Sequence, residues 1–228
     1  MQLTDLQTNI DYRRRDTTTT FISEAEKIAY LNEALRIIAS ENEWEWTKTS
    51  TTFTYTDGSY QYALSGIASD NKFPIDLFYS YNQQFEMVSP EDFRKLSASA
   101  LNMYATDNTY LFVRSSFGSG SLQYHYYSDN TSKTSGGSWL AAISSTTDEP
   151  LIPVRFQDML VDFAAARCYQ KESLMDDYQI AYSDFLRKLS KMKREFAPKR
   201  SKALKRMTHI NEFGARGVYA DKENPLHT

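Results

Sequence analysis

Apolar residues recur at helical spacing in three long stretches of the chain, and each stretch predicts an amphipathic helix. The first helix begins after Ser23, which forms an S-x-x-E capping box with Glu26. The second opens at Pro153, and the third follows a break near residues 171–173. Because each helix has one apolar face, the three must pack on one another. The predicted core of this bundle is Ile28, Leu31, Leu35, Ile38, Phe156, Leu160, Phe163, Phe185 and Leu189.

A shorter helix is predicted over residues 3–12, ahead of the first long one. Thr4 and Gln7 form a T-x-x-Q capping box, and the apolar residues of this segment fall on one side. Trp44 and Trp46 follow the first long helix and are expected to seal its end.

The pattern changes to period two further along the chain, which predicts strands. Residues 51–56 and 59–64 flank Asp57-Gly58, which is a strong signal for a two-residue hairpin. A type I′ turn needs a positive φ at both central positions, and this dipeptide suits it. The register of the hairpin would place four aromatic side chains on one face, namely Phe53, Tyr55, Tyr60 and Tyr62.

A second hairpin is predicted from residues 110–114 and 122–127, joined by the loop 115–121. The middle third of the chain is therefore expected to be a small, aromatic-rich antiparallel sheet. Between the two hairpins, the pattern also indicates strands over residues 75–81 and 84–88 and a short helix that Ser89 caps.

The polar segment over residues 128–149 is predicted to be a long loop. It is rich in Ser, Thr and Gly, and Trp139 and Leu140 are expected to be exposed in its middle. Loops of this length usually serve a function or lack fixed structure.

The order helix, sheet, helix, helix predicts an α+β fold, in which a helical bundle carries an inserted β subdomain. The bundle comprises residues 1–46 and 150–197, and the insertion with its polar loop comprises residues 47–149. Residues 198–228 are expected to form an extended, basic C-terminal arm, because the helical pattern fades at Ala197-Pro198 and few apolar residues follow.

Positive charge is concentrated near the C-terminus. Residues 187–206 contain ten Lys or Arg and one acid, a net charge of +9, whereas the whole chain carries −3; the remainder therefore carries −12. Such a segment is typical of a part that reaches another subunit, an anionic surface or a nucleic acid, and a solvated terminus without fixed structure is the alternative. The arm residues expected to make contacts are Lys199, Arg200, Lys202, Lys205, Arg206, Ile210, Phe213 and Tyr219.

The composition describes a globular chain with a substantial core. Hydrophobic residues make up 41% and aromatic residues 14%, while Gly and Pro are scarce. The single cysteine, Cys168, excludes a disulfide framework within the chain and indicates a reducing compartment at synthesis. No signal peptide and no apolar run of about 20 residues is recognisable, so no membrane partner is expected.

No set of residues in the sequence predicts catalysis. His125 and Cys168 could form a nucleophilic pair, but Cys168 lies among alanines in a helical pattern, where a packed core thiol is favoured. No side chains have metal-ligand spacing and no phosphate-binding glycine motif occurs, so neither a metal nor a cofactor is expected. Adjacent acids such as Glu91 and Asp92 lie at predicted helix ends, where capping explains them better than the carboxylate pair of a glycosidase.

Four segments together resemble the head–tail connector, or adaptor, proteins of tailed bacteriophages. The resemblance is one of order and pattern and spans about residues 3–196, while the segment after Pro198 is similar in role rather than in letters. The segments are residues 28–39 (IAYLNEALRIIA), 72–77 (KFPIDL) with 88–96 (VSPEDFRKL), 123–127 (QYHYY) and 149–160 (EPLIPVRFQDML).

The resemblance implies a structural protein of the virion and not an enzyme. It implies a homo-oligomeric ring, commonly of twelve subunits, beneath the portal protein, with tail or nozzle proteins on its other side. Genomic DNA would pass through the ring without sequence-specific binding, and an acidic body suits such a channel. The arm would embrace the portal. The protein would be made in the bacterial cytoplasm and reside at the portal vertex.

Two other functions remain open at this point. A nucleic-acid-binding protein that uses the basic C-terminal segment is the first alternative, because that segment could neutralise several phosphates. A phage cell-wall hydrolase is the less favoured one, since the acidic pairs lie at helix ends.

Overall fold

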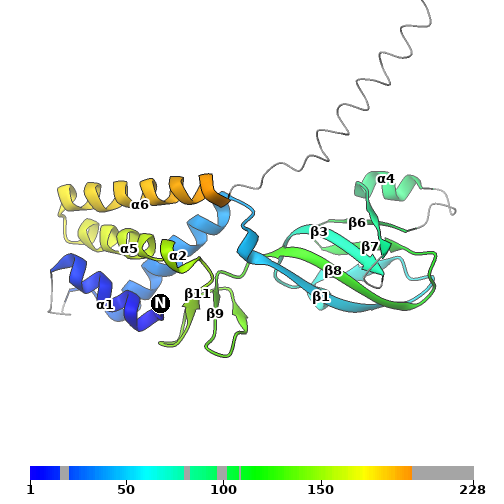
Figure 1. Ribbon diagram of the computed structural model, residues 1–228, viewed down its shortest axis with the longest axis horizontal. Helices are drawn as coiled ribbons and strands as arrows, with labels where there is room; N and C mark the ends of the chain where they lie inside the picture. Colours follow the sequence, from blue (N-terminus) through cyan, green and yellow to red (C-terminus); the bar gives the residue numbers. More distant parts are fainter. Residues whose placement is uncertain (16–20, 80–82, 97–101, 108, 197–228) are drawn as a thin grey trace, which may run out of the picture. The chain divides into compact units, whose positions relative to one another are not determined.

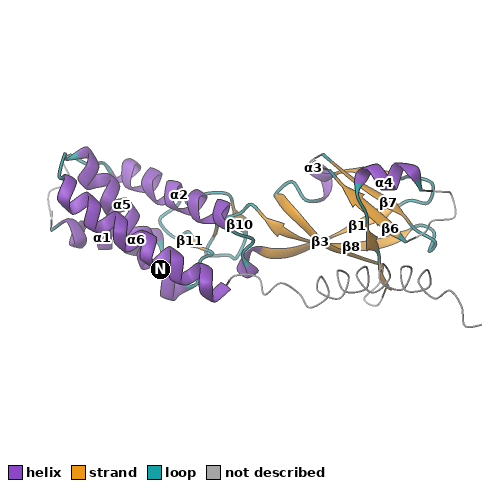
Figure 2. Ribbon diagram, turned by 90° about the horizontal axis from the view of Figure 1, so that it is seen from above, coloured by secondary structure: helices purple, strands orange, loops and turns teal. Residues whose placement is uncertain are grey.

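The long helices α1, α2, α5 and α6 form one group and the strands β1 to β8 form another, as Figure 2 shows by colour. The chain is therefore α+β, which confirms the predicted fold class. The computed structural model describes residues 1–15, 21–79, 83–96, 102–107 and 109–196, and the predicted arm lies outside them.

Helix α5 (Asp158–Lys171) is the central element of the helical part. It packs against α1 (Leu3–Arg14), α2 (Glu24–Glu41) and α6 (Met175–Phe196), and Figure 1 shows it between α6 and α1. Nine of its 14 residues are buried, as expected of a helix with neighbours on several sides. In contrast, α6 buries one stripe and leaves the remainder of its surface exposed.

Local capping signals place the starts of the helices. The predicted box at α2 is confirmed, because Ser23 Oγ accepts from Glu26 N at 3.3 Å and the Glu26 carboxylate accepts from Ser23 N at 2.9 Å. Helix α1 begins before the predicted T-x-x-Q box. Its N-cap is Gln2, whose backbone N–H donates to Asp5 Oδ2 at 3.0 Å. Asp5 also suits the positive end of the helix dipole.

The core of the helical part is one cluster of buried aliphatic and aromatic side chains. Ile28 was expected in this core but is only partly buried, while Lys27 next to it is fully buried. Lys27 Nζ donates to Asp11 at 2.7 Å and to Glu24 at 2.8 Å. Burial alone would lower the pKa of Lys27, but these two hydrogen bonds outweigh it and the pKa is raised. The expected residues that are buried here are Leu31, Leu35, Ile38, Phe156, Leu160, Phe163, Phe185 and Leu189.

The β part contains two four-stranded sheets in place of the single sheet that was expected. Its strands are β1 (Lys48–Tyr55), β2 (Gln61–Ala63), β3 (Asn71–Tyr79), β4 (Gln83–Gln84), β5 (Glu86–Met87), β6 (Met103–Thr106), β7 (Tyr110–Arg114) and β8 (Gly120–Ser128).

The chain passes back and forth between the two sheets. Sheet 1 has the order β1-β8-β3-β4 and sheet 2 has the order β2-β7-β6-β5. All neighbouring pairs are antiparallel except β5 and β6, which are parallel. The two sheets share one aromatic-rich core, to which sheet 1 contributes Tyr55, Leu77 and Tyr124 and sheet 2 contributes Tyr104 and Leu111.

The hairpin predicted at Asp57-Gly58 is wrong. Strand β1 pairs with β8 and β2 pairs with β7, so the turn carries the chain from sheet 1 to sheet 2. Gly58 has a φ of +82°, but Asp57 has no positive φ, which fits a type II turn and not type I′. An aromatic contact still forms, with the rings of Phe53 and Tyr62 5.2 Å apart, whereas Tyr60 is exposed.

The second predicted hairpin is also wrong. Strand β7 lies between β2 and β6, and β8 lies between β1 and β3. The connection from β7 to β8 therefore crosses between the sheets, as the turn after β1 does.

The segment predicted as a polar loop contains a third, small sheet. Its strands are ordered β10 (Trp139–Leu140), β9 (Ser132–Lys133) and β11 (Glu149–Pro150), so Trp139 and Leu140 are half-buried instead of exposed. Ile143 from the same segment is buried in the helical core. Asn32 on α2 holds it there by donating to Ile143 O and accepting from Ile143 N, both at 2.9 Å.

The end of β8 is tied down by one carboxylate. Asp70 accepts hydrogen bonds from Tyr126 Oη at 2.8 Å, from Asn130 Nδ2 at 2.7 Å and from Ser128 Oγ. Its backbone oxygen also accepts from Asp129 N at 2.8 Å. The turn before β3 is thus fixed to the exit of β8.

The remaining short elements include the predicted helix at Ser89. It is confirmed as α4, because Ser89 Oγ accepts from Asp92 N at 3.0 Å and Pro90 occupies the first turn. The bounds of these elements are η1 (Glu45–Thr47), α3 (Leu64–Ile67), α4 (Pro90–Lys95) and η2 (Val154–Phe156).

Candidate docking site at the end of the last helix

An aromatic cluster fixes the last turn of α6. The ring of Phe196 lies 4.9 Å from Trp46 and 5.9 Å from Phe156, in edge-to-face contacts. Trp46 in turn stacks on Trp44 at 4.6 Å. Edge-to-face and offset-stacked pairs are the favoured aromatic geometries and stabilise beyond the area that they bury. Three segments distant in sequence therefore meet where the described part of the chain ends.

Two polar contacts hold this cluster in place. The Arg155 guanidinium lies over the rings of Phe156 and Phe196, 5.3 and 5.1 Å from their centroids, and it forms an ion pair with Glu195. Trp44 Nε1 donates to Ile38 O at 2.7 Å, so this buried indole has a partner. We name Trp44, Trp46, Arg155, Phe156 and Phe196 the root cluster.

Part of the positive charge of α6 belongs to the fold. Lys188 Nζ lies 2.7 Å from the buried carboxylate of Asp162, which also contacts Arg13 of α1 at 2.7 Å. Arg13 reaches Asp184 at 2.9 Å, and Lys193 pairs with Glu41 of α2. These bonds join α6 to α1, α5 and α2. Lys188 and Lys193 are therefore structural, which the charge pattern alone did not indicate.

Three other basic residues of α6 face solvent along one side of the helix. Arg187, Lys191 and Arg194 are exposed, and their spacing of four and three places them on one stripe. Arg187 pairs with Asp184 at 2.9 Å, but its side chain remains 77% exposed. We name these three residues the basic stripe. It leads along α6 toward the root cluster.

A hollow of ≈ 360 Å³ lies on the seam of α1, α5 and α6. Arg13 and Lys188 line it together with Asp158, and Asp162 already pairs with both cations. Charges of both signs therefore meet there, which gives the hollow no marked preference for an anion. Its lining is Asn9, Tyr12, Arg13, Asp158, Val161 and Lys188.

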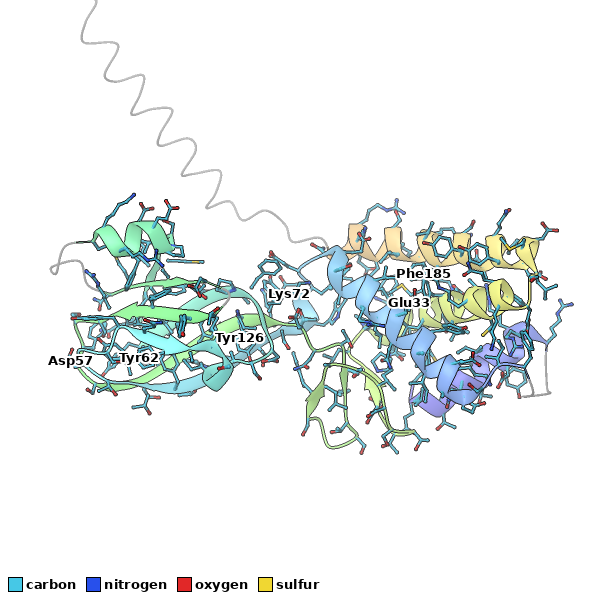
Figure 3. All side chains as sticks on the ribbon, turned by 180° about the vertical axis from the view of Figure 1, so that it is seen from behind. Glu33, Asp57, Tyr62, Lys72, Tyr126 and Phe185 are labelled. Carbon is cyan, nitrogen blue, oxygen red and sulfur yellow. The ribbon has the colours of Figure 1, made fainter. Side chains whose placement is uncertain are left out.

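The residues singled out in the sequence fall into three places. The core residues lie around α5, and Figure 3 labels Phe185, whose ring is 5.0 Å from that of Phe163. Asp57 lies in the turn after β1, near Tyr62 in the same view. The eight arm residues, from Lys199 to Tyr219, lie outside the described residues. The structure thus describes the chain up to Phe196, two residues before the predicted arm.

The suggested nucleophilic pair is not assembled. Cys168 is buried in the helical core, and burial raises the pKa of its thiol to about 11. His125 lies on β8 in sheet 1, with its ring 5.4 Å from that of Phe78. The acids Glu91 and Asp92 occupy the first turn of α4. Across the described ranges, no three His, Cys, Asp or Glu side chains are grouped to hold a metal ion.

The root cluster itself was only half visible in the sequence. Trp44 and Trp46 were expected to seal α2, but the contact of Trp46 with Phe196 joins residues far apart in the chain. Nothing in the sequence pointed to a role for Arg155, because a single exposed arginine near a helix start is common. Nothing pointed to the buried Asp162 either, since hydrophobic periodicity does not register a buried ion pair.

Comparison with known protein families identifies a relationship. A family model described as SU10 adaptor protein matches residues 1–209, which includes the root cluster, the basic stripe and the first residues of the predicted arm. No curated protein matches the chain. Among the helices that the structure describes, none is long and apolar enough to cross a membrane.

Proposed function

The chain belongs to the SU10 adaptor protein family, a family of phage adaptors, and from this premise we propose that it forms a ring beneath the portal. The ring, of about twelve copies, joins the capsid to the tail and surrounds the DNA channel. Portal protein lies on one side of it and tail or nozzle proteins on the other. The protein acts by binding and needs no catalytic group.

The observation that supports this proposal is the fixed end of α6. The root cluster holds Phe196 against η1 and η2, while the charge beyond it is strongly basic. A segment that leaves a rigid point can be aimed at a partner, because less freedom is lost on binding. Residues 198–228 number 31, so fully extended they reach at most about 100 Å.

In this proposal, the arm docks on the portal through two kinds of contact. Its apolar residues Ile210, Phe213 and Tyr219 fill separate pockets on the partner, which is how buried anchors supply most binding energy. Its basic residues pair with acids and speed the encounter. The body carries the compensating negative charge, which suits a wall along which DNA slides without adhering.

Deleting residues 198–228 tests the docking role. We expect the truncated chain to stay folded, because the described residues up to Phe196 already form a large buried core in the helical part. Its helical circular dichroism should match that of the full chain, and co-sedimentation with purified portal should fall at least tenfold. Full portal binding by the truncated chain would contradict the proposal. Loss of the helical signal would show instead that the segment belongs to the fold.

Charge substitutions separate the arm from the basic stripe. Changing the five basic arm residues to Gln should weaken portal binding and reduce its salt dependence, because screening shortens from about 10 Å at 0.1 M salt to about 3 Å at 1 M. The matched control changes Lys191 and Arg194, which lie on α6, and should leave portal binding unchanged. Equal loss in both variants would indicate general attraction to a basic surface. The arm substitutions are Lys199→Gln, Arg200→Gln, Lys202→Gln, Lys205→Gln and Arg206→Gln.

Nucleic-acid binding is the second candidate, and the solvent-facing basic stripe is the observation that favours it. Arg187, Lys191 and Arg194 could each contact a phosphate, whereas the acidic remainder of the chain opposes DNA. Fluorescence anisotropy with a labelled duplex discriminates the two functions. Micromolar binding at 0.15 M salt that disappears in the Lys191 and Arg194 variant would favour the nucleic-acid function. No binding would favour the adaptor ring.

A further inference from the structure

The start of α6 presents apolar side chains to solvent. Leu174 and Met175 are 46% and 51% exposed, and Phe21, from the link between α1 and α2, is 55% exposed. Leu174 N donates to Tyr169 O at 2.9 Å, which joins the start of α6 to the last turn of α5. Lys171 Nζ, in the same turn, donates to Phe21 O at 3.1 Å. Single exposed apolar residues are ordinary, but three that gather at one end of a helix pair indicate a contact surface.

Two acids lie beside these apolar side chains. Asp176 and Asp177 occupy the first turn of α6 and are exposed. They suit the positive end of the helix dipole. The described ion pairs that join α6 to α1, α2 and α5 begin farther along it, at Asp184, so the charge of these two acids remains available to a partner. We name the following residues the distal patch: Phe21, Leu174, Met175, Asp176 and Asp177.

The sequence beyond Phe196 divides into two halves of different charge. Residues 197–209 contain five basic residues and no acid, whereas residues 210–228 contain two basic residues and three acids. The family match ends at residue 209, so it includes the first half and not the second. The first half also carries two apolar residues that the portal-docking role does not use, Leu204 and Met207. The two halves therefore suit different partners.

We propose that residues 199–207 dock on the distal patch of the neighbouring copy in the ring. Leu204 and Met207 pack on its apolar side chains, and adjacent basic residues pair with its two carboxylates. The inference rests on the proposed ring and names the surfaces that join its copies. Two carboxylates engage two of the five basic residues, which leaves the others and the second half of the arm for the portal.

The length of the chain excludes docking on the same copy. Helix α6 has 22 residues, so its two ends are about 32 Å apart at 1.5 Å per residue. Leu204 follows Phe196 by eight residues and reaches at most about 29 Å from it, even when the chain is fully extended. The chain would also have to reverse its direction first, and a turn takes about four residues. The distal patch that Leu204 meets therefore belongs to another copy.

The contact joins the copies in one direction. The root cluster and the distal patch lie at opposite ends of α6, whose first and last turns Figure 1 shows at opposite ends of the helical part. Each copy therefore gives its segment to one neighbour and receives the segment of the other. Head-to-tail contacts of this kind close into a ring when the rotation between copies divides a full turn.

Cysteine crosslinking of the full chain tests the direction of the contact. The variant Met175→Cys with Leu204→Cys places one thiol on the distal patch and one on the segment, and a short bifunctional maleimide joins them with and without purified portal. The native Cys168 is buried and does not react. We expect a ladder of covalent dimers, trimers and longer chains, because each copy is linked to two neighbours. The matched control, Ala29→Cys with Leu204→Cys, moves the first thiol to an exposed position on α2 and should give little product.

A charge exchange gives an independent measurement. In the crosslinking variant, Asp176→Lys with Asp177→Lys gives the distal patch the same sign as the segment and should reduce the yield of the ladder about tenfold. Lys205→Glu with Arg206→Glu should do the same. Combining the two pairs of changes restores opposite charges and should restore the ladder, which a merely misfolded patch would not allow. Asp129→Lys, at an exposed acid of the β part, should leave the yield unchanged.

The sizes of the crosslinked products decide between the possible contacts. A product that stays monomeric would show docking on the same copy, and dimers with nothing longer would show a reciprocal pair; either result overturns the proposal. Equal product in the control, or no ladder with and without portal, overturns it as well. Co-sedimentation measures portal binding of the wild-type chain separately. Binding without a ladder would refute only this inference, and a ladder without binding would refute only the portal-docking role.

Discussion

Hydrophobic period, helix caps and turn residues predict the local elements in both the helical part and the β part of this protein. They predict how those elements pack only in the helical part. In the helical part, the predicted helices form near their expected places and pack on one another. In the β part, the strands lie near their expected places, but both predicted hairpins are wrong and the strands divide between two sheets. The backbone hydrogen bonds of a helix form within the helix itself. Those of a strand form with a partner strand, which the residues of the first strand do not specify.

Core truncation should show the largest effect, and it tests whether the two parts unfold together. In Phe163→Ala, the helical core loses a ring in contact with Phe185 and Tyr182, which should cost about 3–5 kcal/mol. Urea unfolding followed by tryptophan fluorescence measures this cost. All three tryptophans, Trp44, Trp46 and Trp139, lie outside β1 to β8.

The fluorescence signal therefore reports the helical part and the small third sheet but not β1 to β8, and far-ultraviolet circular dichroism reports all of them. Coincident transitions in the variant would mean that the two parts unfold as one unit. A fluorescence transition that shifts alone would sharpen the contrast between them.

Removing the carboxylate at the end of β8 should have the next largest effect. Asp70→Ala leaves Tyr126, Ser128 and Asn130 without their shared acceptor, and we expect a loss of roughly 2–3 kcal/mol. Tyr126→Phe removes only one of these hydrogen bonds and should cost about 1 kcal/mol. Thermal unfolding of both variants measures the difference. Equal losses would show that the carboxylate does not act as a shared acceptor.

The turn after β1 should give a smaller effect. Gly58→Val places a β-branched residue at φ +82° and should cost roughly 1–2 kcal/mol. Gly66→Ala is the matched control, because Gly66 has no positive φ and an added Cβ would meet no atom within 4 Å. Chemical denaturation compares the two. An unchanged midpoint in Gly58→Val would mean that the turn tolerates another conformation.

Acid should weaken the helical part slightly through one exposed carboxylate. Hydrogen bonds from Lys171, followed by those from Ser23, lower the pKa of Glu26 from 4.5 to about 2. A lowered pKa means that this stabilisation is present above pH 4.5 and is lost as the pH falls toward 2. In Glu26→Gln, the melting temperature should fall less steeply between pH 4.5 and 2 than in the wild type. Asp129→Asn, at an exposed acid, should leave the slope unchanged.

These contrasts explain how much of the molecule the sequence could predict. Some features depend only on residues within about four positions of one another. They are the caps at Ser23 and Ser89, the core faces of α5 and α6, and the break before α6. The pairing of β1 with β8 does not, and the Asp57-Gly58 signal favoured the nearer strand. Gly at the second central position suits type I′ and type II turns alike, so the dipeptide could not distinguish a hairpin from a crossing.

The candidate docking site could likewise be predicted from the sequence only in part. A basic window at the C-terminus was evident from composition, but its division into structural and solvent-facing residues was not. Lys188 and Lys193 find Asp162 and Glu41 only after the helices pack. Likewise, the contact of Trp46 with Phe196 requires the finished fold. The sequence therefore predicted where charge accumulates, and packing decides which charges remain available.

The pairing of Lys48 with Tyr127 has a consequence for how this protein can change over time. The chain enters the β part at the start of β1 and leaves it at the end of β8, and these two points are neighbours in the ladder. A recombination event that replaced everything between them would have to bridge only about 5 Å. Related phages could thus exchange this cassette for another while inheriting the same helices, so that the surface of the β part diversifies while the helical part is kept.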